Sequence, residues 1–122
     1  MKSKAGQWVR VENYIGQFVE QFNKYFVLEN PNWFSKMASK GKEHISLFKN
    51  KYLTEQKSTP QELVRSGDLV KVSNVMVEVW VYGEEIYMEN DEDVFISKEI
   101  ITEIWTKASE DTYKCQWRKE NE

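Results

Sequence analysis

Few residues in this chain have side chains suited to catalysis. His44 is the only histidine and Cys115 the only cysteine. A nucleophilic relay would need His44 beside Cys115 or a serine, and the two residues come from opposite halves of the chain. We therefore expect no enzyme activity and no catalytic residue. We interpret His44 as a solvent-facing residue of a helix and Cys115 as a small, buried apolar residue.

Metal and cofactor binding have equally little support. Protein zinc sites draw on several cysteine and histidine ligands, and this chain has one of each. Residues 90–93 offer oxygen ligands, but they lack the alternating ligands, central glycine and distal glutamate of an EF-hand loop. The five glycines are scattered, so no phosphate-binding loop is predicted. We expect neither a metal nor a cofactor.

The carboxylates of the second half form the most pronounced charged feature. Six of them fall within residues 84–93, with no lysine or arginine among them: Glu84, Glu85, Glu89, Asp91, Glu92 and Asp93. Two interpretations stay open. The cluster can be a solvated loop that protects a sheet edge from aggregation. It can also be an acidic patch that attracts a basic partner surface.

The first half carries the opposite charge. Lysine and arginine outnumber acidic residues 10 to 5 over residues 1–58, whereas acidic residues outnumber basic ones 15 to 7 over residues 59–122. Lys36, Lys40 and Lys49 could neutralise phosphates and form an alternative nucleic-acid face. No arginine stands among them, although arginine makes the commonest base-specific contact. We interpret these lysines mainly as the solvated face of a helix.

The spacing of apolar residues predicts that the first half is helical. They recur at steps of three and four, which places them on one helix face: Trp8, Val11, Ile15, Phe18, Phe22 and Tyr25. This pattern predicts a helix over about 7–28. Asn30 and Pro31 can cap and begin a second helix over 31–53. The short break between the two predicts an antiparallel helical pair.

Alternation predicts strands in the second half. Thr59 and Glu62 have the spacing of a capping box, so one short turn is expected there. Over residues 75–82, four valines alternate with larger or charged residues, as in a central strand. Five to six short strands with tight turns predict a small antiparallel sheet or SH3-like barrel. The predicted fold class is α+β, with a helical half (1–58) and a β half (59–122) in one compact domain.

Three large side chains of the predicted central strand share the face opposite the valines. These are Met76, Trp80 and Tyr82. We expect the helical pair to cover them, because an exposed apolar patch favours aggregation. If this face is uncovered, Trp80 and Tyr82 are the best candidates for an aromatic hot spot that binds a protein.

Two stretches of the second half carry a resemblance. One is Glu62–Val72, with a Leu-Val pair and a Gly-Asp pair. The other joins Ile101–Thr106 to the tryptophan-basic strand Tyr113–Lys119. Together they resemble small accessory proteins of Gram-positive phages and prophages. The resemblance implies a protein of a mobile element that binds a host protein, a class that includes anti-CRISPR and other anti-defence inhibitors. It implies no functional residue.

The leading functional hypothesis joins this resemblance to the acidic patch. We expect a non-enzymatic phage or prophage protein that binds a host protein with a basic surface, such as a Cas effector or another nucleic-acid-handling defence enzyme, and inhibits it. The alternatives are a small nucleic-acid-binding or regulatory module that uses the lysines, and a phage structural or assembly protein.

The expected location is the cytoplasm of the bacterial host, without membrane contact. A single cysteine allows no intramolecular disulfide, and no apolar run has the length of a signal peptide core or a membrane span. The sequence leaves the partner's identity and the oligomeric state open.

Overall fold

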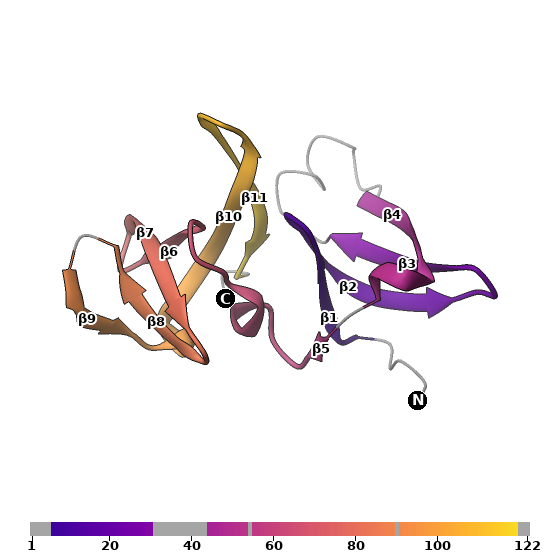
Figure 1. Cartoon of the computed structure of the whole chain (residues 1–122), viewed down its shortest axis with the longest axis horizontal. Coiled ribbons are helices and arrows are strands. Elements are labelled where there is room, and N and C mark those ends of the chain that lie inside the picture. The colour runs from indigo at the N-terminus through magenta and orange to yellow at the C-terminus, as the bar shows by residue number, and fades with distance from the viewer. Residues whose placement is uncertain (1–5, 31–43, 54, 90, 120–122) are drawn as a thin grey trace. The chain divides into compact units, whose positions relative to one another are not determined.

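The chain folds into two compact β units. The structure, a computed structural model, describes residues 6–30, 44–53, 55–89 and 91–119, with the backbone alone for residue 44 and for 91–93. The first unit is Met1–Leu63 and the second is Val64–Glu122. Figure 1 shows the elements of both units. Every strand pairing in the described part of the chain is antiparallel.

The first unit is a five-stranded sheet in the order β4-β3-β2-β1-β5. One-turn 3-10 helices follow β4 and β5. Its elements are β1 (Trp8–Val11), β2 (Tyr14–Gln21), β3 (Tyr25–Asn30), β4 (His44–Lys49), η1 (Asn50–Tyr52), β5 (Gln56–Lys57) and η2 (Pro60–Leu63).

Aromatic rings fill the core of this unit. Phe26 is fully buried, and its ring centroid lies 5.7 Å from that of Phe48 and 6.5 Å from that of Phe18. Strands β2 and β3 come very close beside these rings. A Cβ atom on Gly16 would lie 2.9 Å from Cβ of Leu28, which is closer than such atoms approach in proteins. Position 16 therefore has no room for a side chain unless the strands shift.

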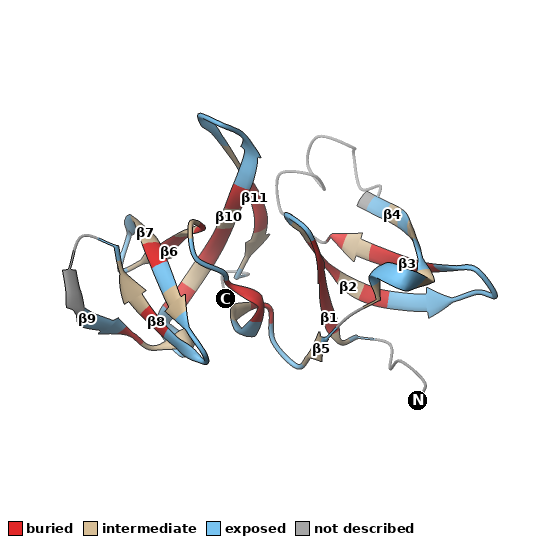
Figure 2. Ribbon diagram, viewed as in Figure 1, coloured by how far each residue is buried: buried red, intermediate tan, exposed pale blue. Residues whose placement is uncertain are grey.

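The face of β1 opposite this core is also covered. Figure 2 shows β1 buried along its whole length. Arg10, only 3% exposed, donates hydrogen bonds from its guanidinium group to the carbonyl oxygen of Leu63 (3.0 Å) and to Oδ1 of Asn13 (3.2 Å). Ile15, directly opposite Arg10 on β2, is fully buried. The Leu63 bond ties η2 to the outer face of β1.

The second unit is a six-stranded sheet in the order β11-β10-β6-β7-β8-β9. Aliphatic residues make its core: Val70, Val79, Ile86, Ile96 and Ile104 are each at most 4% exposed. The elements are β6 (Leu69–Val72), β7 (Val75–Tyr82), β8 (Glu85–Met88), β9 (Asp91–Ile96), η3 (Lys98–Ile100), β10 (Ile101–Ser109) and β11 (Thr112–Arg118).

The two units share one connectivity. In each, four strands follow one another as an antiparallel meander, a one-turn 3-10 helix follows the fourth strand, and the next strand pairs with the first. Their first hairpins are also alike in sequence. Residues 8–13 read Trp-Val-Arg-Val-Glu-Asn and residues 69–74 read Leu-Val-Lys-Val-Ser-Asn. Both turns hold a non-glycine residue at positive φ, Glu12 at 54° and Ser73 at 51°. The chain therefore contains an internal structural repeat.

The predicted helical pair, and with it the α+β fold class, is wrong. The described ranges contain strands and one-turn 3-10 helices and no α-helix. The predicted helix over 7–28 is replaced by β1, β2 and most of β3. Of the predicted helix over 31–53, residues 31–43 lie outside the described residues, and the rest forms β4 and η1.

Turns and a bulge explain the misleading spacing in the first half. The two-residue turn after Val11 and the register shift between Phe18 and Glu20 interrupt the alternation. The apolar residues then recur at steps of three and four, which mimics a helix period. The abundance of valine, isoleucine and aromatic residues favours strands instead.

Candidate partner-binding face

Four aromatic side chains line the outer face of the second unit. Cross-strand partners project to the same side of a sheet, and the register pairs Trp80 with Tyr87 and Tyr87 with Phe95. Tyr82 lies two residues after Trp80 on the same face of β7. We call Trp80, Tyr82, Tyr87 and Phe95 the aromatic stripe. It crosses β7, β8 and β9 and lies opposite the buried side chains of the core.

The aromatic stripe is open to solvent. Tyr82 is 63% exposed, Phe95 56% and Trp80 44%. Met76, on the same face of β7, is also exposed. The expectation that a helical pair covers this face is therefore wrong, because the described residues form no such pair. The sequence predicts an aromatic hot spot at Trp80 and Tyr82 on the condition that this face is uncovered. Among the described residues, nothing covers either side chain.

The rings of the stripe stand at steep angles to one another. The centroid of Tyr87 lies 5.9 Å from that of Phe95, with an interplanar angle of 71°, and 6.1 Å from that of Tyr82, with an angle of 66°. Edge-to-face contacts of this kind are favourable for aromatic pairs. The ring of Tyr87 thus contacts the rings of two neighbours, Tyr82 and Phe95.

A carboxylate stands at each end of the stripe. At one end Glu85 pairs with Tyr82 across the strands and accepts a hydrogen bond from the hydroxyl of Tyr87 at 3.2 Å. Desolvation, this bond and the negative charge of Glu85 together raise the pKa of Tyr87. The phenol therefore stays protonated at neutral pH and remains a donor.

Two carboxylates meet at the other end. The backbone N–H of Glu89 donates to the carbonyl oxygen of Glu78 at 2.9 Å, which places the two residues across from each other. Desolvation, and then the hydrogen bond and charge of Glu89, raise the pKa of Glu78, while Lys107 opposes the rise. Negative charge is therefore in excess beside Trp80.

The described side chains of the predicted acidic patch lie at two separate places. Glu84 lies in the exposed turn before β8 and Glu85 begins that strand, whereas Glu89 follows its far end. The other three predicted residues, Asp91, Glu92 and Asp93, belong to the backbone of β9 rather than to a loop, and their side chains lie outside the description. The described carboxylates thus flank the aromatic stripe and do not form one continuous patch.

Of the three lysines of the alternative nucleic-acid face, the structure describes only Lys49. Lys36 and Lys40 lie outside the described residues. Lys49 ends β4 and is exposed, in a strand rather than on the expected helix face. His44 begins strand β4, so its interpretation as a residue of a helix is wrong. Cys115 is buried, as predicted, and its thiol donates to the carbonyl oxygen of Trp117.

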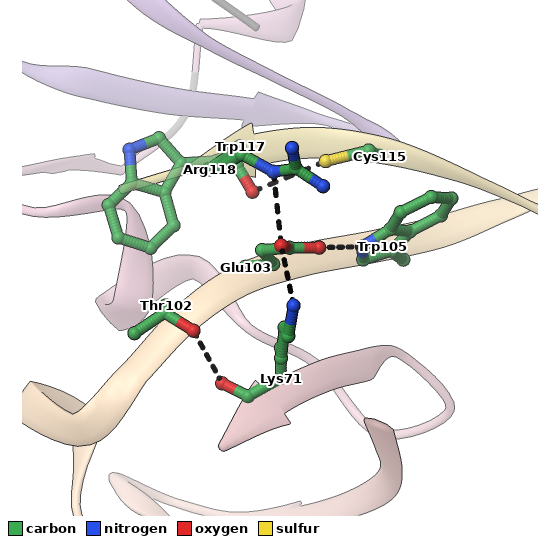
Figure 3. Close-up of polar contacts among 7 residues, drawn as sticks. All are labelled: Lys71, Thr102, Glu103, Trp105, Cys115, Trp117 and Arg118. Carbon is green, nitrogen blue, oxygen red and sulfur yellow. Dashed lines mark hydrogen bonds and ion pairs between the residues drawn. The ribbon is translucent and has the colours of Figure 1, made fainter. Parts of the chain in front are cut away.

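A second polar group lies on the same outer face, where β6, β10 and β11 run together (Figure 3). Glu103, only 5% exposed, is its centre. Its carboxylate lies 3.0 Å from Nε of Arg118 and 3.4 Å from Nζ of Lys71, and it accepts a 2.8 Å hydrogen bond from the indole of Trp105. We call these four residues the Glu103 cluster.

The Glu103 cluster holds strands together. Burial by itself would raise the pKa of Glu103, but the Trp105 hydrogen bond and the charges of Arg118 and Lys71 outweigh it and lower this pKa. The carboxylate is therefore ionised at neutral pH and joins the first strand of the unit to the last two. These ion pairs and the hydrogen bond of Trp105 link three strands, which indicates a structural role.

Comparisons with known proteins add no relative. No protein-family model, curated protein or solved structure matches this chain.

Within the described residues, no group of three or more histidine, cysteine or acidic residues is placed to hold a metal ion. None of the helices in the described ranges has the length and apolar character needed to cross a membrane.

Sequence reasoning missed half of the aromatic stripe. Tyr87 and Phe95 were not singled out, because the register of short strands is not visible from one strand at a time. The signal lies in the turn. If Gly83 and Glu84 form a two-residue hairpin turn, Tyr82 must face Glu85 and Trp80 must face Tyr87.

Proposed function

We propose that this protein is a non-enzymatic binding protein, and that the outer face of β7, β8 and β9 docks a partner protein with a basic surface. The observation that carries this proposal is the exposed aromatic stripe with carboxylates at both ends. Exposed tryptophan and tyrosine are the side chains that most often dominate binding energy in protein interfaces. The flanking carboxylates favour a basic partner and speed its association.

The resemblance to phage accessory proteins supplies the narrower form of the proposal. In that form the partner is a host enzyme that handles nucleic acid, such as a CRISPR effector, and the acidic, aromatic face occupies its basic groove. Binding there would inhibit the enzyme by excluding its nucleic acid.

Capture from a bacterial host lysate tests the broad form. The immobilised chain should retain a basic protein, and the double variant Trp80→Ala with Tyr82→Ala should lose it. Each hot-spot residue contributes about 2 kcal/mol or more to binding. The matched control is Phe22→Ala with Tyr52→Ala, which removes two exposed aromatic side chains from the first unit.

The two outcomes separate cleanly. Loss of capture in the first double variant alone supports the proposed face. Equal capture by both double variants, with folding confirmed by circular dichroism, shows that the aromatic stripe is not the binding surface.

A further inference from the structure

The rings of the aromatic stripe are tilted steeply against one another rather than coplanar. Tyr82 and Phe95 stand at 66° and 71° to the ring of Tyr87. Trp80 faces Tyr87 across the strands and is 44% exposed. Neighbouring rings of the stripe thus differ in orientation, so that a ligand on this face can contact ring faces as well as ring edges. Aromatic faces attract cations through their negative π surface, and several of them together form the cages that bind ammonium groups.

Carboxylates lie on two sides of the Trp80–Tyr87 pair. Glu85 lies beside Tyr82 and Tyr87, and Glu78 and Glu89 face each other beside Trp80. Lys107, on β10, is the cation that acts on Glu78. A cation over the central rings would therefore meet π faces below it and carboxylates on two sides.

We infer that the aromatic stripe binds the cationic head of a lysine or arginine side chain in an exposed segment of the partner, over the Trp80–Tyr87 pair and between Glu85 and the Glu78–Glu89 pair. This deepens the proposed function and rests on it. Charge complementarity selects the occupant, because the ammonium and guanidinium groups are the protein cations that both aromatic faces and carboxylates stabilise.

Other occupants fit this charge pattern less well. Single-stranded nucleic acid stacks its bases on aromatic side chains, but its phosphates would lie beside Glu85 and Glu78 and be repelled. A second copy of the chain, docked symmetrically, would set its own carboxylates against these same residues. A cationic peptide segment meets neither penalty.

The test is a titration of the full-length chain with short synthetic peptides of equal length. One peptide carries two arginines, one two lysines, one two citrullines as neutral arginine isosteres, and one two glutamates. The readouts are calorimetry and the indole N–H resonances of the tryptophans in two-dimensional NMR spectra. We expect the arginine and lysine peptides to bind about tenfold more tightly than the citrulline peptide.

The same titration locates the site. The cationic peptides should shift the indole signal of Trp80 and leave that of the buried Trp8 unchanged. Trp80→Ala should reduce the affinity about tenfold and Trp80→Phe should restore part of it. Glu85→Gln should reduce both the affinity and its dependence on salt concentration. The matched control, Phe22→Ala, should bind like the wild type.

Three results would overturn the inference. These are equal affinity for the arginine and citrulline peptides, no binding of the cationic peptides at low salt, and tighter binding of a dT oligonucleotide that depends on Trp80. The proposed function survives each of them if capture of a partner protein still requires Trp80 and Tyr82. If capture does not require these residues, the proposed function fails independently.

Discussion

The two units of this chain have the same connectivity, but they differ in where aromatic rings contact one another. In the first unit Phe18, Phe26 and Phe48 lie around the core. In the second unit the fully buried side chains are mostly aliphatic, and four rings stand on the outer face of β7, β8 and β9. The same order of strands therefore supports one unit with a cluster of aromatic rings in its core and another with a row of aromatic rings on its outer face.

The first strand of each unit shows what makes this difference. Arg10 in β1 and Lys71 in β6 occupy equivalent places, each on the outer face and between two valines. Arg10 is buried and bonded to the carbonyl oxygen of Leu63 in η2. Lys71 remains partly exposed and pairs with Glu103. The η2 segment thus covers the outer face of β1 in the first unit. The equivalent strand β6 of the second unit keeps its basic residue partly exposed, and the aromatic stripe lies further along the same outer face.

The largest expected effect tests whether each unit has a core of its own. Phe26→Ala removes a fully buried ring from the first unit and should cost about 3–5 kcal/mol of its stability. Amide hydrogen exchange should then show lost protection in β2 and β3 and retained protection in β6 and β10. The reciprocal control is Ile104→Ala in the second unit. Simultaneous loss of protection in all four strands would show that the two units unfold as one.

The next effect concerns the charged centre of the second unit. Glu103→Gln keeps an acceptor for Trp105 but removes the charge that Arg118 and Lys71 face, so the variant should lose about 1.5–3 kcal/mol at pH 7. Because the folded protein lowers the pKa of Glu103, its contribution is present above the ordinary value of 4.5 and is lost as the pH falls through the lowered pKa. Urea unfolding should show the difference shrinking in acid. A difference that is constant with pH would exclude an ionic origin.

A smaller effect compares the two equivalent basic residues. Arg10→Met should cost about 2 kcal/mol, because it leaves the buried carbonyl oxygen of Leu63 without this donor. Lys71→Met should cost about 1 kcal/mol or less, because the ammonium group is partly solvated. Unfolding midpoints of the two variants provide the measurement. Equal costs would mean that the outer faces of the two units are not covered differently.

The smallest effect is a gain. Glu78→Gln removes one of two facing carboxylates and should stabilise the second unit by about 0.5 kcal/mol at neutral pH. The folded protein raises the pKa of Glu78, so the wild type becomes more stable as the pH falls through that raised value, and the advantage of the variant should disappear there. Glu84→Gln, in the exposed turn, is the control. A similar gain in this control would indicate a general effect of net charge.

The sequence predicted the second unit well because its signals are local. The valine alternation of β7 falls within a single run of eight residues. Trp80 and Tyr82 follow from that alternation alone. Tyr87 requires the register of the β7–β8 hairpin, and Phe95 requires in addition the pairing of β8 with β9, which the sequence of one strand does not show.

The first unit was mistaken for helices because a turn and a bulge together imitate a helical period. Alignment of the chain with itself would have corrected this interpretation. Residues 8–13 match the pattern of residues 69–74, where the strand assignment is secure. The shared pattern of valine, basic residue, valine and turn asparagine predicts a β hairpin in both places.

The close approach of β2 and β3 at Gly16 also limits how far the two copies of the repeated hairpin can be alike. Gly16 faces Val9 across the first hairpin, and in the repeat the equivalent partner of Val70 is Val77. Position 77 holds a valine side chain, whereas a Cβ atom at position 16 would require the strands to shift. The two copies of the hairpin therefore differ at this position, with glycine in the first copy and a β-branched residue in the second.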